Sequence, residues 1–386
     1  MDRYEYIAPC HFGMEAVLKR EIRQLGYEIT EVEDGRVVFE GDALAAARAN
    51  IGLRTAERIL LKAGEFQAAT YDELFEGTRA VPWERYFPAD AKFWVAKASS
   101  VRSALFSPSD IQSVMKKAMV ERMKTRYKKE WFPEDGAHFP LRVTIKKDLV
   151  TIGIDTTGTS LHKRGYRVSP VIAPISETLA AAIIGVTPWF PDRILVDPFC
   201  GSGTIPIEAA MIARRIAPGL KRSFLSESWQ GLLPPSAFDE ARREAREQII
   251  TDGPHDTDIQ GYDIDEKAVR CARDNAAAAG VSDLIHFQKR AVKDLRHPGK
   301  YGFIITNPPY GERLADREGL NALYREIGEA YRGLDSFSMY LISSYEDAEK
   351  AIGRKADKNR KIYNGMLKTY LYQYMGPKPP KRGPHT

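Results

Sequence analysis

The sequence predicts an α/β protein of two or three domains, with a Rossmann-like parallel sheet in its C-terminal half. The first observation is an apolar run at 194–196 that leads into a glycine-containing loop and then an apolar helix opening near Thr204. The second is the alternation of strands and helices that continues beyond this helix. The third is the strand–helix–strand–strand–helix–strand order of residues 1–64. A chain of 386 residues is also long for a single core.

Composition limits the classes of protein that the chain can belong to. The net charge of +5 is only mildly basic, so nucleic-acid binding has to be argued from local clusters of charge. The three cysteines are far apart and form no zinc pattern with the seven histidines, so we expect a reducing compartment and no metal. We find no long apolar stretch and no signal-peptide pattern at the start, so we expect a cytoplasmic protein without a membrane span.

Residues 1–64 read as a ferredoxin-like domain. The expected elements are a strand at 4–9, a helix at 13–26, strands at 27–31 and 36–40, a helix from Asp42 to Asn50 and a strand at 57–64. Asp34-Gly35 is a hairpin signal between the second and third strands. His11 is the only histidine of the domain, and we expect it to be structural.

Residues 65–157 read as a second α/β domain, whose main feature is a basic helix. We expect a helix at 71–77, a strand at 92–99, a long helix capped by Ser109 or Asp110 and ending near Lys129, and a hairpin at 141–154. The candidate RNA-binding cations of the long helix are Lys116, Lys117, Lys124, Arg126, Lys128 and Lys129. A solvated lysine-rich face is the alternative. The neighbouring Tyr127 and Trp131 favour nucleic-acid contact.

The glycine-containing loop is the first candidate site. It consists of Asp197, Pro198, Phe199, Cys200, Gly201, Ser202, Gly203 and Thr204. Helix amides at such a loop can hold a carboxylate, and an aspartate at the strand end can hold an ammonium group. A dinucleotide fingerprint would need a further glycine where Pro206 stands. The combination favours S-adenosylmethionine, with a merely structural turn as the alternative.

The second candidate site is Asn307-Pro308-Pro309-Tyr310, which follows an apolar strand at 301–306. The prolines end the strand and fix an extended turn. This leaves the Asn307 amide oxygen and the Pro308 carbonyl free to accept from one NH2 group, while Tyr310 stacks on the planar group that carries it. We therefore assign Asn307, Pro308 and Tyr310 as catalytic. The alternative is a proline-rich strand exit.

These two motifs resemble motifs I and IV of amino-methylating class I methyltransferases. The Leu-His-Lys-Arg-Gly-Tyr-Arg stretch at 161–167, before Ala-Pro-Ile-Ser-Glu-Thr-Leu-Ala, resembles the junction in THUMP-containing guanine-N2 RNA methyltransferases. The resemblance implies a THUMP-like RNA-binding domain at 65–157, a class I methyltransferase domain at 158–375 and a flexible basic tail at 376–386. It also implies S-adenosylmethionine as cofactor and guanine N2 of large-subunit ribosomal RNA as target, ahead of transfer RNA.

The remaining site assignments concern the cofactor and the RNA. We expect Asp263 to accept from ribose hydroxyls, Ile264 to lie against the adenine ring and Asn307 to contact the cofactor as well. In related enzymes an acidic residue accepts from the adenine amine. Ala291 stands at the matching position here, so a backbone acceptor or Asp294 would serve. The cations that could face RNA phosphates, or form only a basic linker, are His162, Lys163, Arg164 and Arg167.

Several alternatives of function remain at this point. Methylation of adenine N6 in DNA and methylation of a protein glutamine use the same Asn-Pro-Pro-Tyr motif to bind an NH2 group. The N-terminal domains favour RNA over both of these substrates. A pyrimidine-C5 enzyme would need a thiolate near Asn307, whereas Cys200 lies in the cofactor loop and reads as packing. A non-catalytic RNA-binding protein would not need both motifs intact. The sequence leaves the role of the insert at 220–258 open.

Overall fold

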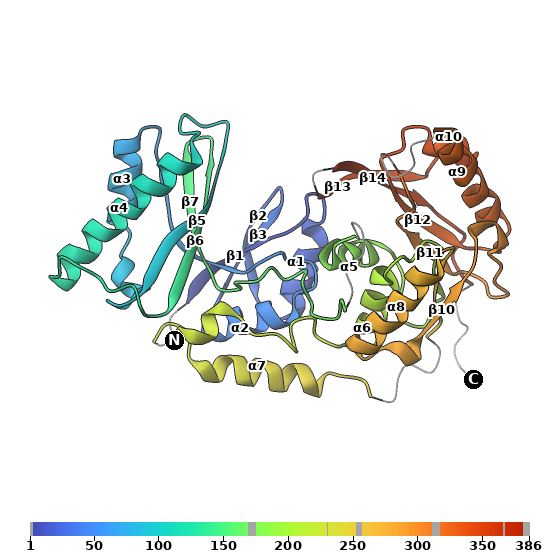
Figure 1. Cartoon of the computed structure of the whole chain (residues 1–386), viewed down its shortest axis with the longest axis horizontal. Helices are drawn as coiled ribbons and strands as arrows, with labels where there is room; N and C mark the ends of the chain where they lie inside the picture. Colours follow the sequence, from blue (N-terminus) through green and yellow to red (C-terminus); the bar gives the residue numbers. More distant parts are fainter. Residues whose placement is uncertain are drawn as a thin grey trace. The chain divides into compact units, whose positions relative to one another are not determined.

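The computed structural model describes residues 3–168, 175–229, 231–251, 257–310, 317–365 and 367–380 (Figure 1). The chain divides into two compact units. The first contains residues 1–10, 19–161 and 222–244, and the second contains residues 11–18, 162–221 and 245–386. Within the described ranges, no helix is both long and apolar enough to cross a membrane.

The first unit is built on one seven-stranded sheet of order β2-β3-β1-β4-β7-β6-β5. The N-terminal elements are β1 (Tyr4–Pro9), α1 (Glu15–Gln24), β2 (Glu28–Glu33), β3 (Arg36–Gly41), α2 (Ala43–Gly52) and β4 (Leu60–Gln67). The Asp42 carboxylate caps α2 by accepting from the Ala45 amide at 3.1 Å, as the sequence predicts. The order β2-β3-β1-β4 is that of a ferredoxin-like sheet.

Strand β4 belongs to both halves of this sheet. Leu60 and Leu61 pair with β1 on one side, and the strand pairs from Leu60 to Gln67 with β7 (Leu149–Asp155) on the other. The strand therefore runs across the domain boundary expected after residue 64. The two halves share a hydrogen-bonded strand where the sequence suggests a break.

The other half of the sheet is covered on one face by α3 and α4, which lie side by side (Figure 1). Its further elements are α3 (Tyr71–Ala80), β5 (Lys92–Val101), α4 (Pro108–Tyr127) and β6 (His138–Lys146). Helix α4 begins at Pro108 after Ser107, two or three residues earlier than expected, because proline suits the first helical turn. It ends at Tyr127 because Lys128 has a left-handed backbone, with φ of 53°.

Residues 222–244 of the insert are part of the first unit. They contain most of α7 (Pro235–Glu247). The indole Nε1 of Trp229 donates to the His138 carbonyl at 2.9 Å, and the Trp229 ring stacks on Phe139 with centroids 4.6 Å apart. Glu244 of α7 accepts from Arg48 of α2 at 2.7 Å. Because Trp229 is fully buried, the insert completes the core of this unit.

The second unit is a seven-stranded sheet of order β10-β9-β8-β11-β12-β14-β13. Its elements are α5 (Glu177–Val186), β8 (Leu195–Asp197), α6 (Thr204–Ala213), β9 (Ile259–Asp263), α8 (Glu266–Ala279), β10 (Ile285–Lys289), β11 (Phe303–Thr306), α9 (Arg317–Arg332), β12 (Ser338–Ser343), α10 (Ala348–Ile352), β13 (Lys358–Asn364) and β14 (Leu367–Tyr374). Strands β8 to β12 are parallel, and β14 and β13 are antiparallel. The predicted Rossmann-like sheet is confirmed, and it ends in an antiparallel hairpin.

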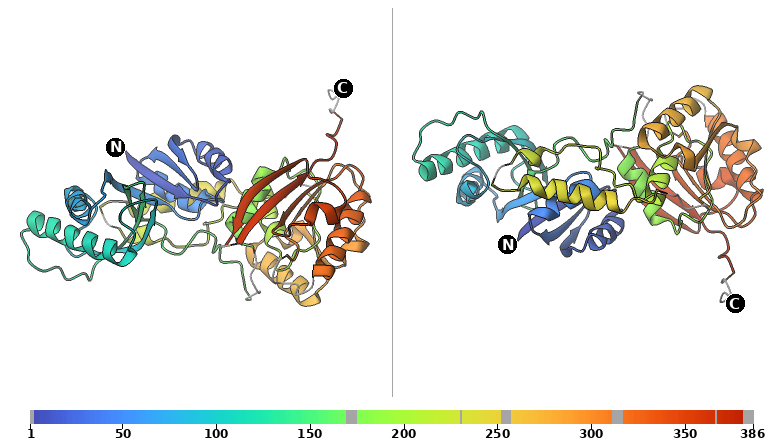
Figure 2. Two further views of the ribbon diagram at one scale, coloured as in Figure 1. Left: turned by 90° about the horizontal axis from the view of Figure 1, so that it is seen from above. Right: turned by 90° about the horizontal axis from the view of Figure 1, so that it is seen from below.

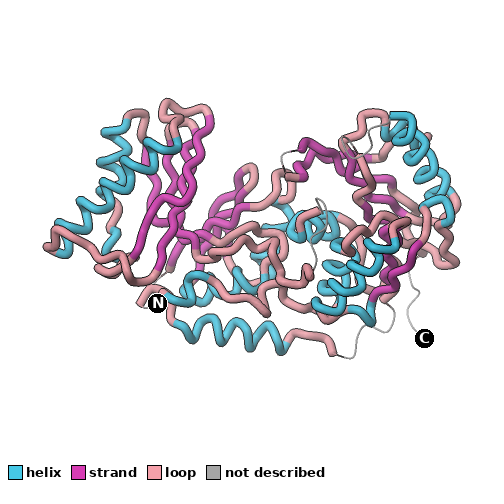
Figure 3. Tube along the Cα trace, in the orientation of Figure 1, coloured by secondary structure: helices cyan, strands magenta, loops and turns pink. Residues whose placement is uncertain are grey.

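Helices cover both faces of this sheet, as the tube view and the two further views show (Figures 2 and 3). One core joins α5, α6 and α8 to the sheet through residues such as Leu179, Ile207 and Ala272. The other joins α9 and α10 to it through residues such as Tyr324 and Ile352. The carboxyl ends of parallel strands meet at one edge of a sheet, so the residues after β8, β9 and β11 lie together. Pro174, expected to open α5, lies outside the described residues.

Candidate active site

Asp197 ends β8 and lies beneath the glycine-containing loop. Its Oδ1 accepts from the Phe199 amide at 3.1 Å and from the Thr306 hydroxyl at 2.7 Å. The side chain is buried, and burial raises the pKa of Asp197 to about 7, with the nearby Asp263 charge adding to the effect. The Thr306 and Phe199 hydrogen bonds oppose this shift. Asp197 therefore joins the ends of β8 and β11 and carries a carboxyl group that titrates near neutral pH.

The loop glycines have two different roles. Gly203 has φ of +82°, and a Cβ there would lie 2.9 Å from the Phe287 ring and 3.0 Å from Ala272, so the missing side chain lets α6 approach α8 and β10. Gly201 has φ of +51°, and a Cβ there would meet no atom within 4 Å among the described residues. The backbone at Gly201 therefore borders open space, as a loop that receives a ligand requires.

Asp263 ends β9 and faces the same loop. Its Oδ2 accepts from the Gly201 amide at 3.0 Å and its Oδ1 from the Asp265 amide at 3.0 Å. Each carboxylate oxygen has a further lone pair that can accept from a ligand hydroxyl. The neighbouring Ile264 is 71% exposed, which is unusual for an isoleucine and leaves an apolar surface beside the carboxylate. Asp265 caps α8 through the Lys267 amide, as predicted.

Asn307 follows β11 directly after Thr306. Its Oδ1 is buried and has no hydrogen-bond partner among the residues that the structure describes. A buried acceptor without a donor is rare in folded proteins and costs about 1–3 kcal/mol. The Thr306–Asp197 hydrogen bond places this acceptor beside the loop of β8. The asparagine oxygen is thus an acceptor for which the described residues supply no N–H donor.

Tyr310 lies differently from the expectation of an accessible stacking ring. It is 3% exposed and packs in the α9 side of the core. Its hydroxyl accepts from Asn364 Nδ2 of β13 at 2.8 Å. Stacking of Tyr310 on a substrate base stays a prediction, and it requires the ring to leave this packing.

Arg167 connects the segment before α5 to the glycine-containing loop. Its guanidinium donates to Glu177 at 2.7 Å, to Ser202 Oγ at 2.9 Å and to Thr204 Oγ1 at 3.0 Å. A fourth hydrogen bond goes to the Ile175 carbonyl at 2.9 Å. These internal contacts replace the expected approach of Arg167 to RNA phosphates. Arg167 holds the N-terminus of α5 and the N-terminus of α6 in one arrangement.

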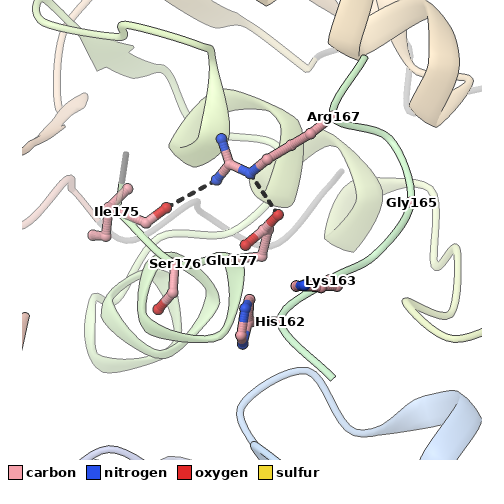
Figure 4. A pocket seen from close by; sticks show the side chains of 7 residues that line it. All are labelled: His162, Lys163, Gly165, Arg167, Ile175, Ser176 and Glu177. Carbon is pink, nitrogen blue, oxygen red and sulfur yellow. Dashed lines mark hydrogen bonds and ion pairs between the residues drawn. The ribbon is translucent and has the colours of Figure 1, made fainter. Parts of the chain in front are cut away.

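A pocket of about 490 Å3 lies at this junction (Figure 4). Arg167 reaches across it toward Glu177 and the Ile175 carbonyl. The lining residues are His162, Lys163, Gly165, Arg167, Ile175, Ser176 and Glu177. The Ser176 hydroxyl caps α5 by accepting from the Leu179 amide, and His11 contacts both Ser176 and Thr178 within 3.3 Å. His11 is thus structural, as expected, at the start of α5.

The other cations of this segment separate into two kinds. Arg164 is buried and its Nε lies 3.5 Å from the fully buried Glu208 carboxylate. The expectation that Arg164 faces RNA is therefore wrong, because an isolated buried arginine would be far too costly and Glu208 compensates it. Lys163 is exposed and His162 half-buried, so these two keep access to the pocket and to solvent.

The basic residues of α4 also separate into two kinds. Lys116 is held by Glu134 and donates to the Phe93 carbonyl at 2.6 Å, while Lys124 lies 3.3 Å from Glu130. Arg126 lies 3.6 Å from Glu84. Lys117, Lys128 and Lys129 are exposed and have no ion-pair partner in the described part of the chain. RNA contact by this helix stays a prediction, and the structure favours the last three lysines for it.

The residues expected to contact the adenine follow β10. The Ala291 carbonyl accepts from the Asp294 amide at 3.0 Å, and the Asp294 side chain is exposed. Because a carbonyl oxygen has a second lone pair, a backbone acceptor and the Asp294 carboxylate both stay predictions for this contact.

Cys200 fits the packing role predicted for it. The side chain is buried, and burial raises the pKa of the Cys200 thiol well above its usual value. A neutral buried thiol is a poor nucleophile. Among the described residues, no three His, Cys, Asp or Glu side chains come close enough together to hold a metal ion.

Two residues that position the site are absent from the sequence-based assignment. Thr306 donates to Asp197, and Asn275 of α8 donates to the Ser202 carbonyl and accepts from the Val168 amide, both at 2.9 Å. The sequence does contain a signal for Asn275, because it is a polar residue on the apolar, buried face of an alanine-rich helix.

The fold and the site together define a class I methyltransferase. A parallel sheet with a final antiparallel hairpin holds a glycine-containing loop, a ribose-type acidic strand end and an Asn-Pro-Pro-Tyr motif at one edge. The chain matches the family described as RMKL-like, methyltransferase domain, over residues 164–373. It also matches the RlmL ferredoxin-like domain over residues 5–60 and the THUMP domain over residues 68–155.

Individual relatives agree with this family. The chain is 47% identical to "Putative RNA methyltransferase YpsC" of Bacillus subtilis strain 168, over 99% of this chain and 98% of that protein. It is 35% identical to the ribosomal RNA large subunit methyltransferase K/L of Syntrophotalea carbinolica, over 96% of this chain and 53% of that protein. This chain thus spans about half the length of the K/L enzyme. A solved "putative methyltransferase complexed with SAH" shares 42% identity over 98% of this chain and 100% of that one, with a TM-score of 0.91.

The chain therefore belongs to the RMKL-like methyltransferase family, with N-terminal ferredoxin-like and THUMP domains. The predicted family, the fold class and dependence on S-adenosylmethionine are confirmed at this level.

Proposed function

We propose that this protein transfers a methyl group from S-adenosylmethionine to N2 of a guanine in 23S ribosomal RNA. The single observation that supports amine methylation best is the buried, unpartnered Oδ1 of Asn307 beside the glycine-containing loop. It is an acceptor that lacks an N–H donor, and it follows β11 at the edge of the sheet where the cofactor loop lies.

The chain offers a complementary group for each part of the cofactor. S-adenosylmethionine supplies the methyl group on a positively charged sulfonium. The free lone pairs of Asp263 accept from the ribose hydroxyls, and the exposed face of Ile264 covers the adenine ring. The Asp197 carboxyl attracts the cofactor ammonium, and open space beside Gly201 lets the ligand approach the backbone. Asp294 accepts from the adenine amine.

Asn307 and Pro308 act on the acceptor base. The guanine amine is a weak nucleophile because its lone pair is delocalised into the ring. Two acceptors, the Asn307 oxygen and the Pro308 carbonyl, hold its two hydrogens and direct the lone pair at the methyl carbon. Positioning then supplies most of the rate, and no strong base is needed because the amine becomes acidic once it is methylated.

The RNA assignment rests on the N-terminal half. A THUMP domain and a ferredoxin-like domain precede the methyltransferase domain, and the K/L relatives are named for large-subunit ribosomal RNA. Transfer RNA is the runner-up. Methylation of adenine N6 in DNA is less favoured because it leaves the RNA-binding THUMP domain without a use.

The test is methyl transfer from labelled S-adenosylmethionine to protein-free ribosomal and transfer RNA of a deletion strain, with the product nucleoside identified by mass spectrometry. We expect N2-methylguanosine in 23S ribosomal RNA. Asn307→Ala should slow single-turnover transfer by about a hundredfold, the scale found when one positioned polar group is lost. Cofactor affinity measured by calorimetry should change much less, because the amine contact serves the transition state.

Ser99→Ala serves as the control, because this hydroxyl lies in the first unit and contacts only the Val143 and Thr144 region. It should react at the parental rate. A parental rate in Asn307→Ala would contradict the amine mechanism. N6-methyladenosine or a methylated pyrimidine as product would contradict the guanine assignment.

A further inference from the structure

The hairpin of β13 and β14 presents an unusual set of side chains on one face. Lys361 pairs with Tyr370, and Tyr363 pairs with Lys368, so two lysines and two tyrosines alternate on neighbouring positions of one face. The Lys361 ammonium lies 5.3 Å from the Tyr363 ring, and the Lys368 ammonium lies 5.3 Å from the Tyr370 ring. We call these four residues the lysine–tyrosine platform.

The two faces of the hairpin differ sharply. On the opposite face Ile362, Thr369 and Leu371 are fully buried in the core with α5, α6 and α8. On the platform face both lysines are exposed and both tyrosines are half-buried. Residues 358–374 contain no aspartate or glutamate, and Glu346 is the acidic group that acts on Lys368. The Tyr363 ring meets Phe12 edge-on with centroids 6.1 Å apart, and Tyr370 packs in part against the core of α9 and α10. The platform is therefore positively charged and aromatic, with exposed lysines and two rings that are accessible only in part.

The register places the platform at the catalytic edge of the sheet. Tyr370 pairs with Ser343, the last residue of β12, so this end of the hairpin lies at the carboxyl ends of the parallel strands. Asp197, Asp263 and Thr306 end their strands at the same edge. Asn364, at the tip of the hairpin, donates to Tyr310 at 2.8 Å. The hairpin thus directly contacts the motif that contains Asn307.

Protection of a sheet edge explains only part of the platform. Lysines on an edge strand commonly prevent pairing with another chain, and β13 is an edge strand in this sheet (Figure 2). Lys368 is on β14, but the pairing of β14 with β12 ends at Tyr370, so Lys368 pairs only with Tyr363 of β13. Edge protection therefore applies to both lysines, but it does not explain the two tyrosines beside them.

We propose that the lysine–tyrosine platform binds the single-stranded RNA that flanks the methylated nucleotide. Successive bases stack on the Tyr363 and Tyr370 rings, and the phosphates between them pair with the Lys361 and Lys368 ammonium groups. Binding there leads the strand toward Asn307. The inference rests on the proposed RNA substrate and adds a second contact surface, within the catalytic unit itself.

The charge contribution is tested with two matched pairs of variants in the full-length protein. Lys361→Gln/Lys368→Gln removes the platform lysines. Lys355→Gln/Lys358→Gln removes two exposed lysines outside it, since Lys358 pairs with Gln373 near the opposite end of the hairpin. Binding of a fluorescein-labelled oligouridine is titrated over a range of KCl concentrations. We expect the platform pair to lower the slope of log K against log salt by about 1.4, from about 0.7 for each lost phosphate contact. The control pair should keep the parental slope.

The aromatic contribution is tested with Tyr363. Tyr363→Leu should weaken oligouridine binding by about tenfold, whereas Tyr363→Phe should bind like the parent because the ring provides the stacking surface. Cofactor binding measured by calorimetry should be unchanged in all variants, which verifies that each one is folded. Blunt-ended duplex RNA should respond much less to Tyr363→Leu, since its bases are not free to stack.

Equal salt slopes for the two lysine pairs, or parental oligouridine binding by Tyr363→Leu, would overturn the platform. These outcomes are separate from failure of the proposed function. If the parent protein added no methyl group to RNA, the function would fail, while the oligouridine titration would still report on the platform.

Discussion

At the scale of single residues, Asp197 combines burial with a carboxyl group that titrates near neutral pH. Its folded-state pKa of about 7 lies well above the ordinary value of 3.8, so the folded protein holds this proton more tightly than the unfolded chain does. Between these two values the stability of the free protein therefore falls as pH rises, by at most about 1.4 kcal/mol for each pH unit. A ligand cation beside the carboxylate would stabilise its charged form and so offset this loss of stability.

Asp197→Asn should stabilise the free protein at pH 8 by about 1–3 kcal/mol, because the amide keeps an acceptor for Thr306 and Phe199 without a buried charge. Urea unfolding at pH 6 and pH 8 measures this difference, which should be smaller at pH 6.

The same Asp197→Asn variant should bind S-adenosylmethionine more weakly. In the parent, cofactor affinity should rise between pH 6 and pH 8, and in the variant this rise should disappear. An identical pH dependence of affinity in both proteins would contradict the role given to Asp197.

At the scale of secondary-structure elements, the contact between α2 and α7 fixes the insert in place. The Arg48 guanidinium forms a two-pronged hydrogen bond with the Glu244 carboxylate and holds the pKa of Glu244 below its usual value. Glu244→Gln should lower the stability of the protein at pH 7 by about 1 kcal/mol, since the pair is partly exposed. Urea unfolding measures the change, with Glu240→Gln, an exposed glutamate of the same helix, as the control.

The pH dependence of that pair has a definite sign. A carboxylate with a lowered pKa contributes stability above its unfolded-state value and loses it as pH falls through the folded-state value. The difference between parent and Glu244→Gln should therefore disappear in acid, below about pH 4. A difference that persists undiminished at pH 3 would show that the glutamine disturbs packing instead.

The elements also show which features the sequence could reveal. The glycine-containing loop, the helix that starts after Asp42 and the hairpin at Asp34-Gly35 depend on neighbouring residues, and the sequence predicts them well. The four contacts of Arg167, the burial of Tyr310 and the packing of Trp229 on Phe139 join segments that are distant in sequence. Charge and spacing alone do not encode such partners. For this reason Arg164 and Arg167 read as RNA-facing cations, although Arg164 is buried beside Glu208 and Arg167 is held by Glu177, Ser202 and Thr204.

At the scale of the whole molecule, RNA binding should depend on cations without an acidic partner. Lys117→Gln/Lys128→Gln/Lys129→Gln should lower the salt slope of RNA binding by up to about 0.7–0.9 for each lysine. Lys116→Gln/Lys124→Gln/Arg126→Gln makes the same change of charge at residues paired with Glu134, Glu130 and Glu84 and should have a smaller effect. Oligonucleotide titration against salt measures both. Equal salt slopes for the two triple variants would show that the lysine-rich face of α4 is solvated and does not contact RNA.

The shared strand β4 and the insert have a consequence for the order in which the protein forms during synthesis. The first unit needs Trp229 and Glu244 to complete its packing, yet these residues follow residues 162–221, which belong to the second unit. A ribosome therefore releases residues 3–161 with the Phe139 side of their core uncovered, and this surface closes only after residue 244 has emerged. A chaperone that binds apolar surface of nascent chains would therefore bind there until residues 229–244 are synthesised. A fragment that ends between residues 161 and 222 would keep this surface exposed permanently.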